Sequence, residues 1–63
     1  MSKFWIEVKH TSKACAPSTK CVATYGTIED ALNYAWDYMI YDFGRNEVTI
    51  YNANMEFVRR ENW

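Results

Sequence analysis

The sequence predicts an α+β domain in which one helix packs on a small, mainly antiparallel sheet, with the elements in the order β-β-α-β-β along the chain. Apolar side chains alternate along residues 3–10, 20–25 and 47–51, which is the period of a half-buried strand. Residues 27–41 instead repeat apolar side chains at helical spacing. With 63 residues, two glycines and one proline, the chain is expected to form a single domain, residues 1–63.

The first two strands are expected to form a hairpin. Phe4, Ile6 and Val8 fall on one face of the first strand, which predicts that they point into the core, whereas Trp5 falls on the other face. Small and polar residues fill positions 11–18 before the second strand begins, as is typical of a loop.

The helix has a recognisable start. Thr27 followed by Glu29 and Asp30 is typical of an N-cap with acidic residues in the first turn, and the helix is expected to run to about Tyr41, before Gly44. One stripe of side chains is expected to face the sheet: Ile28, Ala31, Leu32, Ala35 and Met39, with Trp36 at its shoulder.

The last two strands are expected to form a second hairpin. Val48 and Ile50 should point into the core, residues 52–54 should reverse the chain, and residues 55–59 should form the last strand. The sheet face that the helix leaves uncovered would then be open to a partner.

Composition and charge exclude several classes of function. Seven Lys and Arg residues against eight Asp and Glu residues give a net charge of −1. This charge argues against a protein that binds nucleic acid by neutralising its phosphates. A domain this small has little room for a deep pocket and its supporting residues, so we expect no enzyme activity. No apolar stretch approaches the length of a membrane span, and the first residues lack the apolar run of a secretory signal, so a cytoplasmic protein without membrane contact is expected.

The residues available for catalysis or metal binding form no known motif. His10, Cys15 and Cys21 allow a Cys/His pair or a zinc site in principle, but their spacing matches neither paired cysteine ligands nor a zinc finger. A disulfide between the two cysteines is sterically possible and is opposed by a reducing cytoplasm. Free thiols, no metal and no cofactor are therefore expected.

Aromatic residues exceed what one small core needs, with three Trp, five Tyr and three Phe. Tyr34, Tyr38 and Tyr41 recur on one flank of the helix, with Asp30 and Asp37 on the same side. This face either packs against loops with its hydroxyls in water or binds a protein, since Tyr is favoured at the centre of interfaces.

Two further groups point outward or lie near the C-terminus. Trp5 and Tyr51 fall on the outer side of their strands, either as a cross-strand pair or as an aromatic platform for a partner or for single-stranded bases. Arg59 and Arg60 are the only adjacent basic pair, and such a pair can anchor a carboxylate-bearing partner.

Three segments carry a resemblance to a known family: Lys3-Phe4-Trp5-x-x-Val8, Thr27-Ile28-Glu29-Asp30-Ala31-Leu32-x-x-Ala35-Trp36-x-Tyr38 and Glu47-Val48-Thr49. They resemble the small phage early proteins that inhibit bacterial RNA polymerase. The resemblance implies a single helix on a small antiparallel sheet, and docking on the jaw of the polymerase β′ subunit through an acidic surface and arginines of the last strand.

Carried over position by position, the resemblance places Glu29, Asp30 and Glu47 on the acidic surface. Ile50 and Asn52 stand where the family has its arginines, and the C-terminal segment with the two arginines has no counterpart in that family. The inhibitory action is therefore better supported than the particular target.

The sequence thus predicts a non-enzymatic, phage-type inhibitor that occludes a surface of a larger host protein complex, first of all bacterial RNA polymerase. The alternatives are an anti-CRISPR-type inhibitor of a host nuclease complex and a small nucleic-acid-binding module, although the net charge of −1 argues against nucleic acid as a partner. A monomer and a homodimer paired through an edge strand or the tyrosine flank are both open. The residues expected to bind protein are Trp5, Glu29, Asp30, Tyr34, Asp37, Tyr41, Glu47, Tyr51, Arg59 and Arg60.

Overall fold

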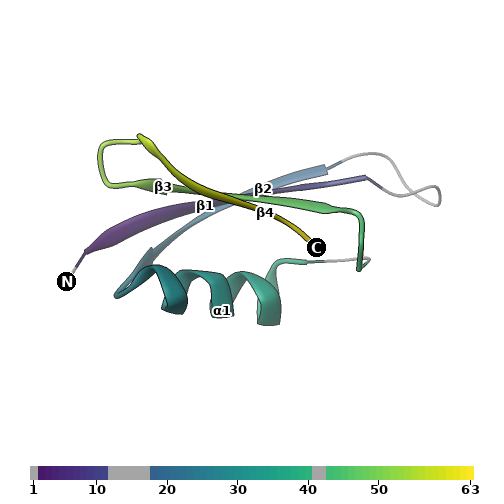
Figure 1. Cartoon of the computed structure of the whole chain (residues 1–63), viewed down its shortest axis with the longest axis horizontal. Coiled ribbons are helices and arrows are strands. Elements are labelled where there is room, and N and C mark those ends of the chain that lie inside the picture. The colour runs from purple at the N-terminus through teal and green to yellow at the C-terminus, as the bar shows by residue number, and fades with distance from the viewer. Residues whose placement is uncertain (1, 12–17, 41–42) are drawn as a thin grey trace.

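The computed structural model describes residues 2–11, 18–40 and 43–63. The elements follow along the chain as β1 (Lys3–His10), β2 (Ser18–Tyr25), α1 (Ile28–Tyr38), β3 (Asn46–Asn52) and β4 (Phe57–Asn62). The four strands form one antiparallel sheet, and α1 covers one of its faces (Figure 1). The α+β class predicted from the sequence is confirmed.

Within the sheet the strands lie in the order β2-β1-β3-β4, so β1 and β3 are central and β2 and β4 are the edges. This order differs from the order along the chain, because α1 carries the chain from one edge of the first hairpin across to the far side of β1 (Figure 1). The sequence pattern did not predict this arrangement.

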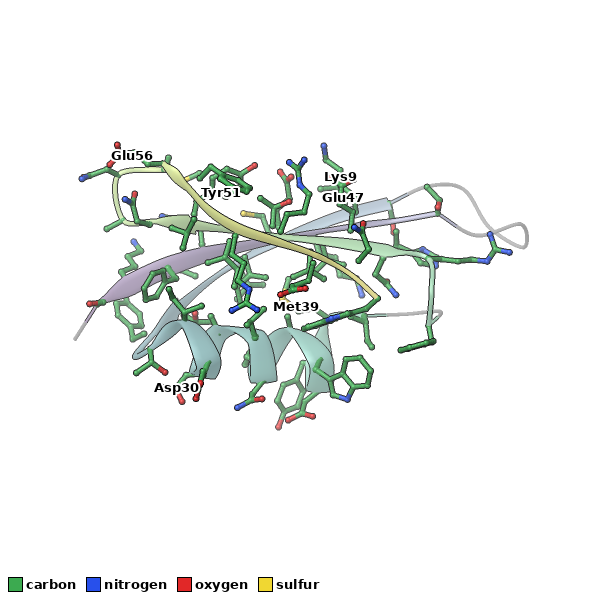
Figure 2. The ribbon with its side chains drawn as sticks, in the orientation of Figure 1. Lys9, Asp30, Met39, Glu47, Tyr51 and Glu56 are labelled. Atoms are coloured by element: carbon green, nitrogen blue, oxygen red, sulfur yellow. The ribbon has the colours of Figure 1, made fainter. Side chains whose placement is uncertain are left out.

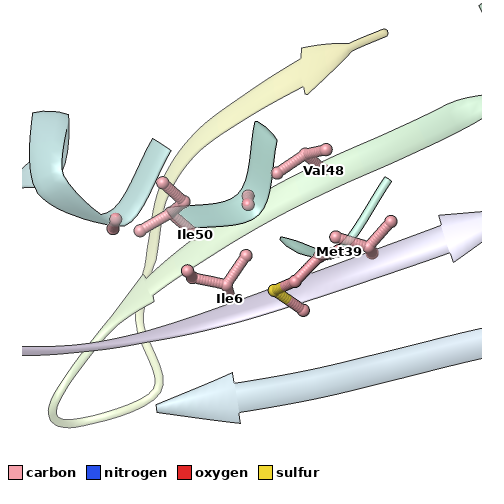
Figure 3. Packing of buried hydrophobic residues seen from close by; sticks show 7 residues of the cluster. Ile6, Met39, Val48 and Ile50 are labelled. Carbon is pink, nitrogen blue, oxygen red and sulfur yellow. The ribbon is translucent and has the colours of Figure 1, made fainter. Parts of the chain in front are cut away.

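The core lies between α1 and the two central strands. Ile6, Val48 and Ile50 are fully buried and contact the apolar stripe of α1 (Figure 3). Ala31 and Ala35 are also fully buried, which lets the helix backbone lie close to the sheet. The predicted stripe is confirmed, with Ile28 and Leu32 partly buried at its margins.

The helix ends earlier than the sequence predicted. Its last residue is Tyr38 and its C-cap is Met39, whose N–H and that of Ile40 both donate to the Ala35 carbonyl, at 2.9 and 3.1 Å. At 100° per residue a longer helix would turn Ile40 away from the sheet. Ending the helix lets Ile40 pack against the core instead. The expected end at Tyr41 was therefore wrong.

The last strand begins two residues later than predicted. The Asn52 carboxamide oxygen accepts hydrogen bonds from the N–H groups of Asn54 (2.9 Å) and Glu56 (3.0 Å), and Met55 adopts a positive φ of 63°. This side-chain-stabilised turn includes residues 55 and 56, so β4 runs from Phe57 to Asn62 rather than over residues 55–59. The second strand also begins earlier, at Ser18 rather than at residue 20.

Candidate functional site

The outward side of α1 forms an acidic surface with two exposed tyrosines. We call Asp30, Tyr34, Asp37 and Tyr38 the acidic helix face; all four are exposed. Glu29 is exposed too, but at 100° per residue it lies on the opposite flank of α1 from Tyr38. The rings of Tyr34 and Tyr38 contact each other, with centroids 5.0 Å apart. The helix carries no Lys or Arg anywhere along its length. This face therefore consists of an aromatic pair with carboxylates beside it. No cation of the same helix lies next to the pair.

Asp30 differs from the other carboxylates of this face because it caps the helix. Its Oδ2 accepts a hydrogen bond from the Thr27 N–H at 2.9 Å, and its own N–H donates to the Thr27 hydroxyl at 3.1 Å. The Thr27 backbone N–H, and next its side chain, lower the pKa of Asp30 below its ordinary value. Asp30 is thus a structural residue of the face, whereas Asp37 has no part in the cap.

Of the three tyrosines expected on one flank of the helix, Tyr41 lies outside the described residues. The structure brings the other two, Tyr34 and Tyr38, into contact, and Tyr38 is the more exposed, at 71% against 38%. Helical spacing gave the signal for Tyr38, which falls four residues after Tyr34.

The second candidate surface is the sheet face that α1 does not cover. Trp5 lies directly opposite Tyr51 across β1 and β3, and Tyr51 lies opposite Phe57 across β3 and β4. These three residues, which we call the aromatic row, cross three strands at one level of the sheet. The sequence predicted the outward direction of the first two and missed Phe57, because the start of β4 was misplaced.

Cations of the same face already lie over the aromatic row. The Lys3 Nζ is 4.4 Å from the centre of the Trp5 ring, and the Arg60 Cζ is 5.6 Å from the centre of the Phe57 ring. A base that stacked on the ring face that either cation covers would have to displace that cation. The row is therefore better suited to side-chain contacts with a protein than to base stacking.

Charges on this face are mixed and mutually paired. The Lys9 Nζ is 3.8 Å from Glu7, and the Arg60 Nε is 3.6 Å from Glu47 and donates to the Thr49 hydroxyl at 3.2 Å. Figure 2 shows Lys9, Glu47 and Tyr51 on the side of the sheet opposite α1. A surface that neutralises phosphates requires a local excess of cations, which these pairs reduce.

Two residue groups that the sequence placed together are separated in the fold. Glu47 lies on the uncovered sheet face, whereas Asp30 lies on the far side of α1 (Figure 2), so the two carboxylates face opposite sides of the molecule. Arg59 is opposite Ile50 and therefore on the helix side of β4, where its Nε is 2.6 Å from Glu61. Arg60 is on the other side, so the two arginines do not act as one anchor.

A third aromatic group surrounds the end of α1. The Trp36 ring makes edge contacts with Trp63 and Phe43, at centroid distances of 5.1 and 5.8 Å. Trp63 is held by backbone bonds in both directions with Asn46, of 2.7 and 2.9 Å. Sequence spacing could not reveal this cluster, because its members are far apart along the chain.

Two of the surface hollows among the described residues have volumes of about 400 and 330 Å³. The first is lined by residues 2–4 and 52–54, and the second includes Lys9, Arg45 and Glu47. Neither lining contains a cysteine or a histidine. Cys21 is exposed on β2 and forms no disulfide, as expected. Cys15 lies outside the described residues, so the same expectation for Cys15 stays a prediction.

Among residues 2–11, 18–40 and 43–63, no group of three or more His, Cys, Asp or Glu residues is arranged to hold a metal ion. Nor is any described helix long and apolar enough to cross a membrane. The chain matches no protein-family model, and it shows no significant similarity to a curated protein or to a solved structure.

Proposed function

We propose that this protein is a non-enzymatic inhibitor that binds a larger host protein through the acidic helix face and covers a surface that the host protein needs. The observation that carries the proposal is the exposed contact between Tyr34 and Tyr38 on a helix with three carboxylates and no cation. Tyrosine is favoured at the centre of protein interfaces because a rigid, amphipathic ring contributes a large contact area.

The chemistry of this face defines the partner. Carboxylates around an aromatic pair attract a basic surface and speed up the encounter with it, while the tyrosine rings supply the contact area. Basic surfaces line the grooves of proteins that handle nucleic acid. Occupying such a groove would block it without any chemical step or cofactor.

Bacterial RNA polymerase is the first target we propose, because three segments of the sequence resemble phage inhibitors of that enzyme. Such an inhibitor would act in the host cytoplasm. The last-strand arginines of that family are replaced here by Ile50 and Asn52, and the fold buries Ile50 completely. A host nuclease complex, as bound by anti-CRISPR-type inhibitors, is therefore the second candidate target.

A nucleic-acid-binding module is the alternative of another class. It would use Trp5 and Tyr51 on the uncovered sheet face, with Arg60 nearby. The ion pairs on that face and the Lys3 ammonium over the Trp5 ring disfavour it. If it were correct, binding would fall steeply with salt and require no protein partner.

Affinity capture from bacterial lysate at low and moderate salt tests the proposal. The bait would be the tagged protein, its Tyr34→Ala/Tyr38→Ala variant and, as a matched control, Phe57→Ala, which removes an exposed aromatic ring from the other side of the sheet. We expect the wild type and the control to retain RNA polymerase subunits at both salt concentrations and the double variant to lose them.

Recovery of a nuclease complex, lost with the same double variant, would keep the mechanism and replace the target. Nucleic acid alone, released at moderate salt, would contradict the proposal, and so would equal capture by the wild type and the double variant.

A further inference from the structure

The two edge strands of the sheet differ in how well they are protected against pairing with another strand. β4 has six residues, its register shifts at a bulge beside Val58, and it carries charged side chains at residues 59–61. Short length, bulges and charges are the usual means of preventing edge-to-edge pairing. β2 has eight residues, pairs with β1 in one unbroken register and carries one charged residue, Lys20. The β2 edge is thus long, regular and nearly uncharged.

The register determines which backbone groups of β2 point outward. The Gly26 N–H donates to the Ser2 carbonyl at 2.9 Å, which makes these residues a hydrogen-bonded pair in line with the register of β1 and β2. Hydrogen-bonded pairs alternate along an antiparallel ladder, so the even-numbered residues of β2 bond to β1. The odd-numbered residues direct their N–H and C=O groups away from the sheet: Thr19, Cys21, Ala23 and Tyr25.

We propose that a second copy of this chain pairs with β2 through its own β2, antiparallel, around a two-fold axis perpendicular to the sheet. Only odd-numbered residues can exchange hydrogen bonds across this edge. The register centred on Val22 pairs Thr19 with Tyr25 and Cys21 with Ala23 of the second copy, and it forms about eight backbone hydrogen bonds. The two sheets would become one continuous sheet, with both helices on the same side.

The side chains of β2 explain why the occupant is a second copy. In this register Val22 meets Val22 on the helix side, where it already packs against the core, and no like charges face each other. Lys20 lies opposite Thr24 of the second copy. The Thr24 hydroxyl is buried and has no hydrogen-bond partner among the described residues, and a lysine ammonium is a donor. Shifting the register by four residues in one direction, so that it is centred on residue 20, would place Lys20 opposite Lys20.

A cysteine placed at the proposed axis tests this arrangement directly. In a background with Cys15→Ser and Cys21→Ser, Val22→Cys would place two cysteines opposite each other in a non-hydrogen-bonded pair, with Cα atoms about 4.5 Å apart. Thr19→Cys is the matched control, because its two copies would lie about 20 Å apart along the paired strands. We expect mild oxidation to convert most of the Val22→Cys protein, and little of the control, to a covalent dimer.

The expected mass of the unmodified protein at micromolar concentrations, measured by analytical ultracentrifugation, is that of a dimer. A monomer over the whole accessible concentration range would overturn the proposal. Equal cross-linking of the two cysteine variants would also overturn it, since it would show random collision.

Ala23→Pro provides a second test that does not depend on oxidation. Its ring would remove an N–H that points away from β1, which an edge strand tolerates, and would obstruct an added strand. Ala23→Thr keeps the N–H and is the control. We expect the proline variant to weaken dimerisation by at least about tenfold, as the loss of two central hydrogen-bonded contacts implies, while its circular dichroism spectrum stays native. An unchanged dimerisation constant in a folded proline variant would contradict the proposal.

Discussion

Thr27 and Asp30 hold the first turn of α1 in place by exchanging two backbone-to-side-chain hydrogen bonds, of 2.9 and 3.1 Å. The two bonds satisfy N–H groups that have no partner within the helix. Because Ala31 and the rest of the buried stripe follow within the next turns, this cap also fixes the position of the acidic helix face relative to the sheet.

Removing the cap should destabilise the domain without changing its core. We expect Thr27→Ala to lower the free energy of unfolding by about 1 kcal/mol, because it leaves the Asp30 N–H without its acceptor. Thr27→Ser keeps the hydroxyl and should cost little. Urea denaturation of both variants at neutral pH makes the comparison, and equal stability of the alanine and serine variants would contradict the role of this cap.

Asp30 should make stability depend on pH in the acidic range. Its pKa is lower in the folded protein than in the unfolded chain, so the unfolded chain binds the proton more readily. The stabilisation is complete well above about pH 4 and is lost as the pH falls below that value, towards the folded-state pKa. Thermal unfolding of the wild type and Asp30→Asn between neutral and acidic pH should show the steeper loss for the wild type. Parallel profiles would exclude this contribution.

At the scale of elements, the core depends on large side chains of the central strands packing against small side chains of α1. Ile50 is completely buried on β3, whereas Leu32 is only partly buried at the margin of the helix stripe. Ile50→Ala should therefore destabilise the domain by about 2–5 kcal/mol, and Leu32→Ala by less than about 2 kcal/mol. Equal losses in chemical denaturation would mean that the core is centred elsewhere.

Local patterns were sufficient to predict most of the elements. The alternation in residues 3–10 predicted β1 correctly over its whole length, and Thr27 with Asp30 predicted the start of α1. Both signals depend only on residues close together in sequence. The end of α1 depends on Ile40 reaching the core, and the start of β4 depends on the turn that Asn52 stabilises, so both depend on contacts that periodicity does not contain.

The candidate site could be predicted only in part for the same reason. Helical spacing predicted that Tyr34 and Asp37 share a face, and strand alternation predicted the outward direction of Trp5 and Tyr51. Spacing could not show that Glu47 lies on the opposite side of the molecule from Asp30, since this depends on the order of the strands in the sheet.

At the scale of the whole molecule, the charges are divided between the two layers. The helix segment has carboxylates and no cation, whereas Lys and Arg residues of the described chain lie on strands and loops: Lys3, Lys9, Lys20, Arg45, Arg59 and Arg60. The net charge of −1 is therefore the sum of an acidic helix layer and a sheet layer with charges of both signs. In the function we propose, such a molecule would present the acidic helix face to a basic partner in a defined orientation.

Binding of the purified protein to purified bacterial RNA polymerase, measured by calorimetry together with transcription from a linear template, tests the central claim most directly. We expect saturable binding and inhibited transcription, both weakened at least about tenfold by Tyr34→Ala/Tyr38→Ala and little changed by Phe57→Ala. Absence of binding with unimpaired transcription would contradict the claim.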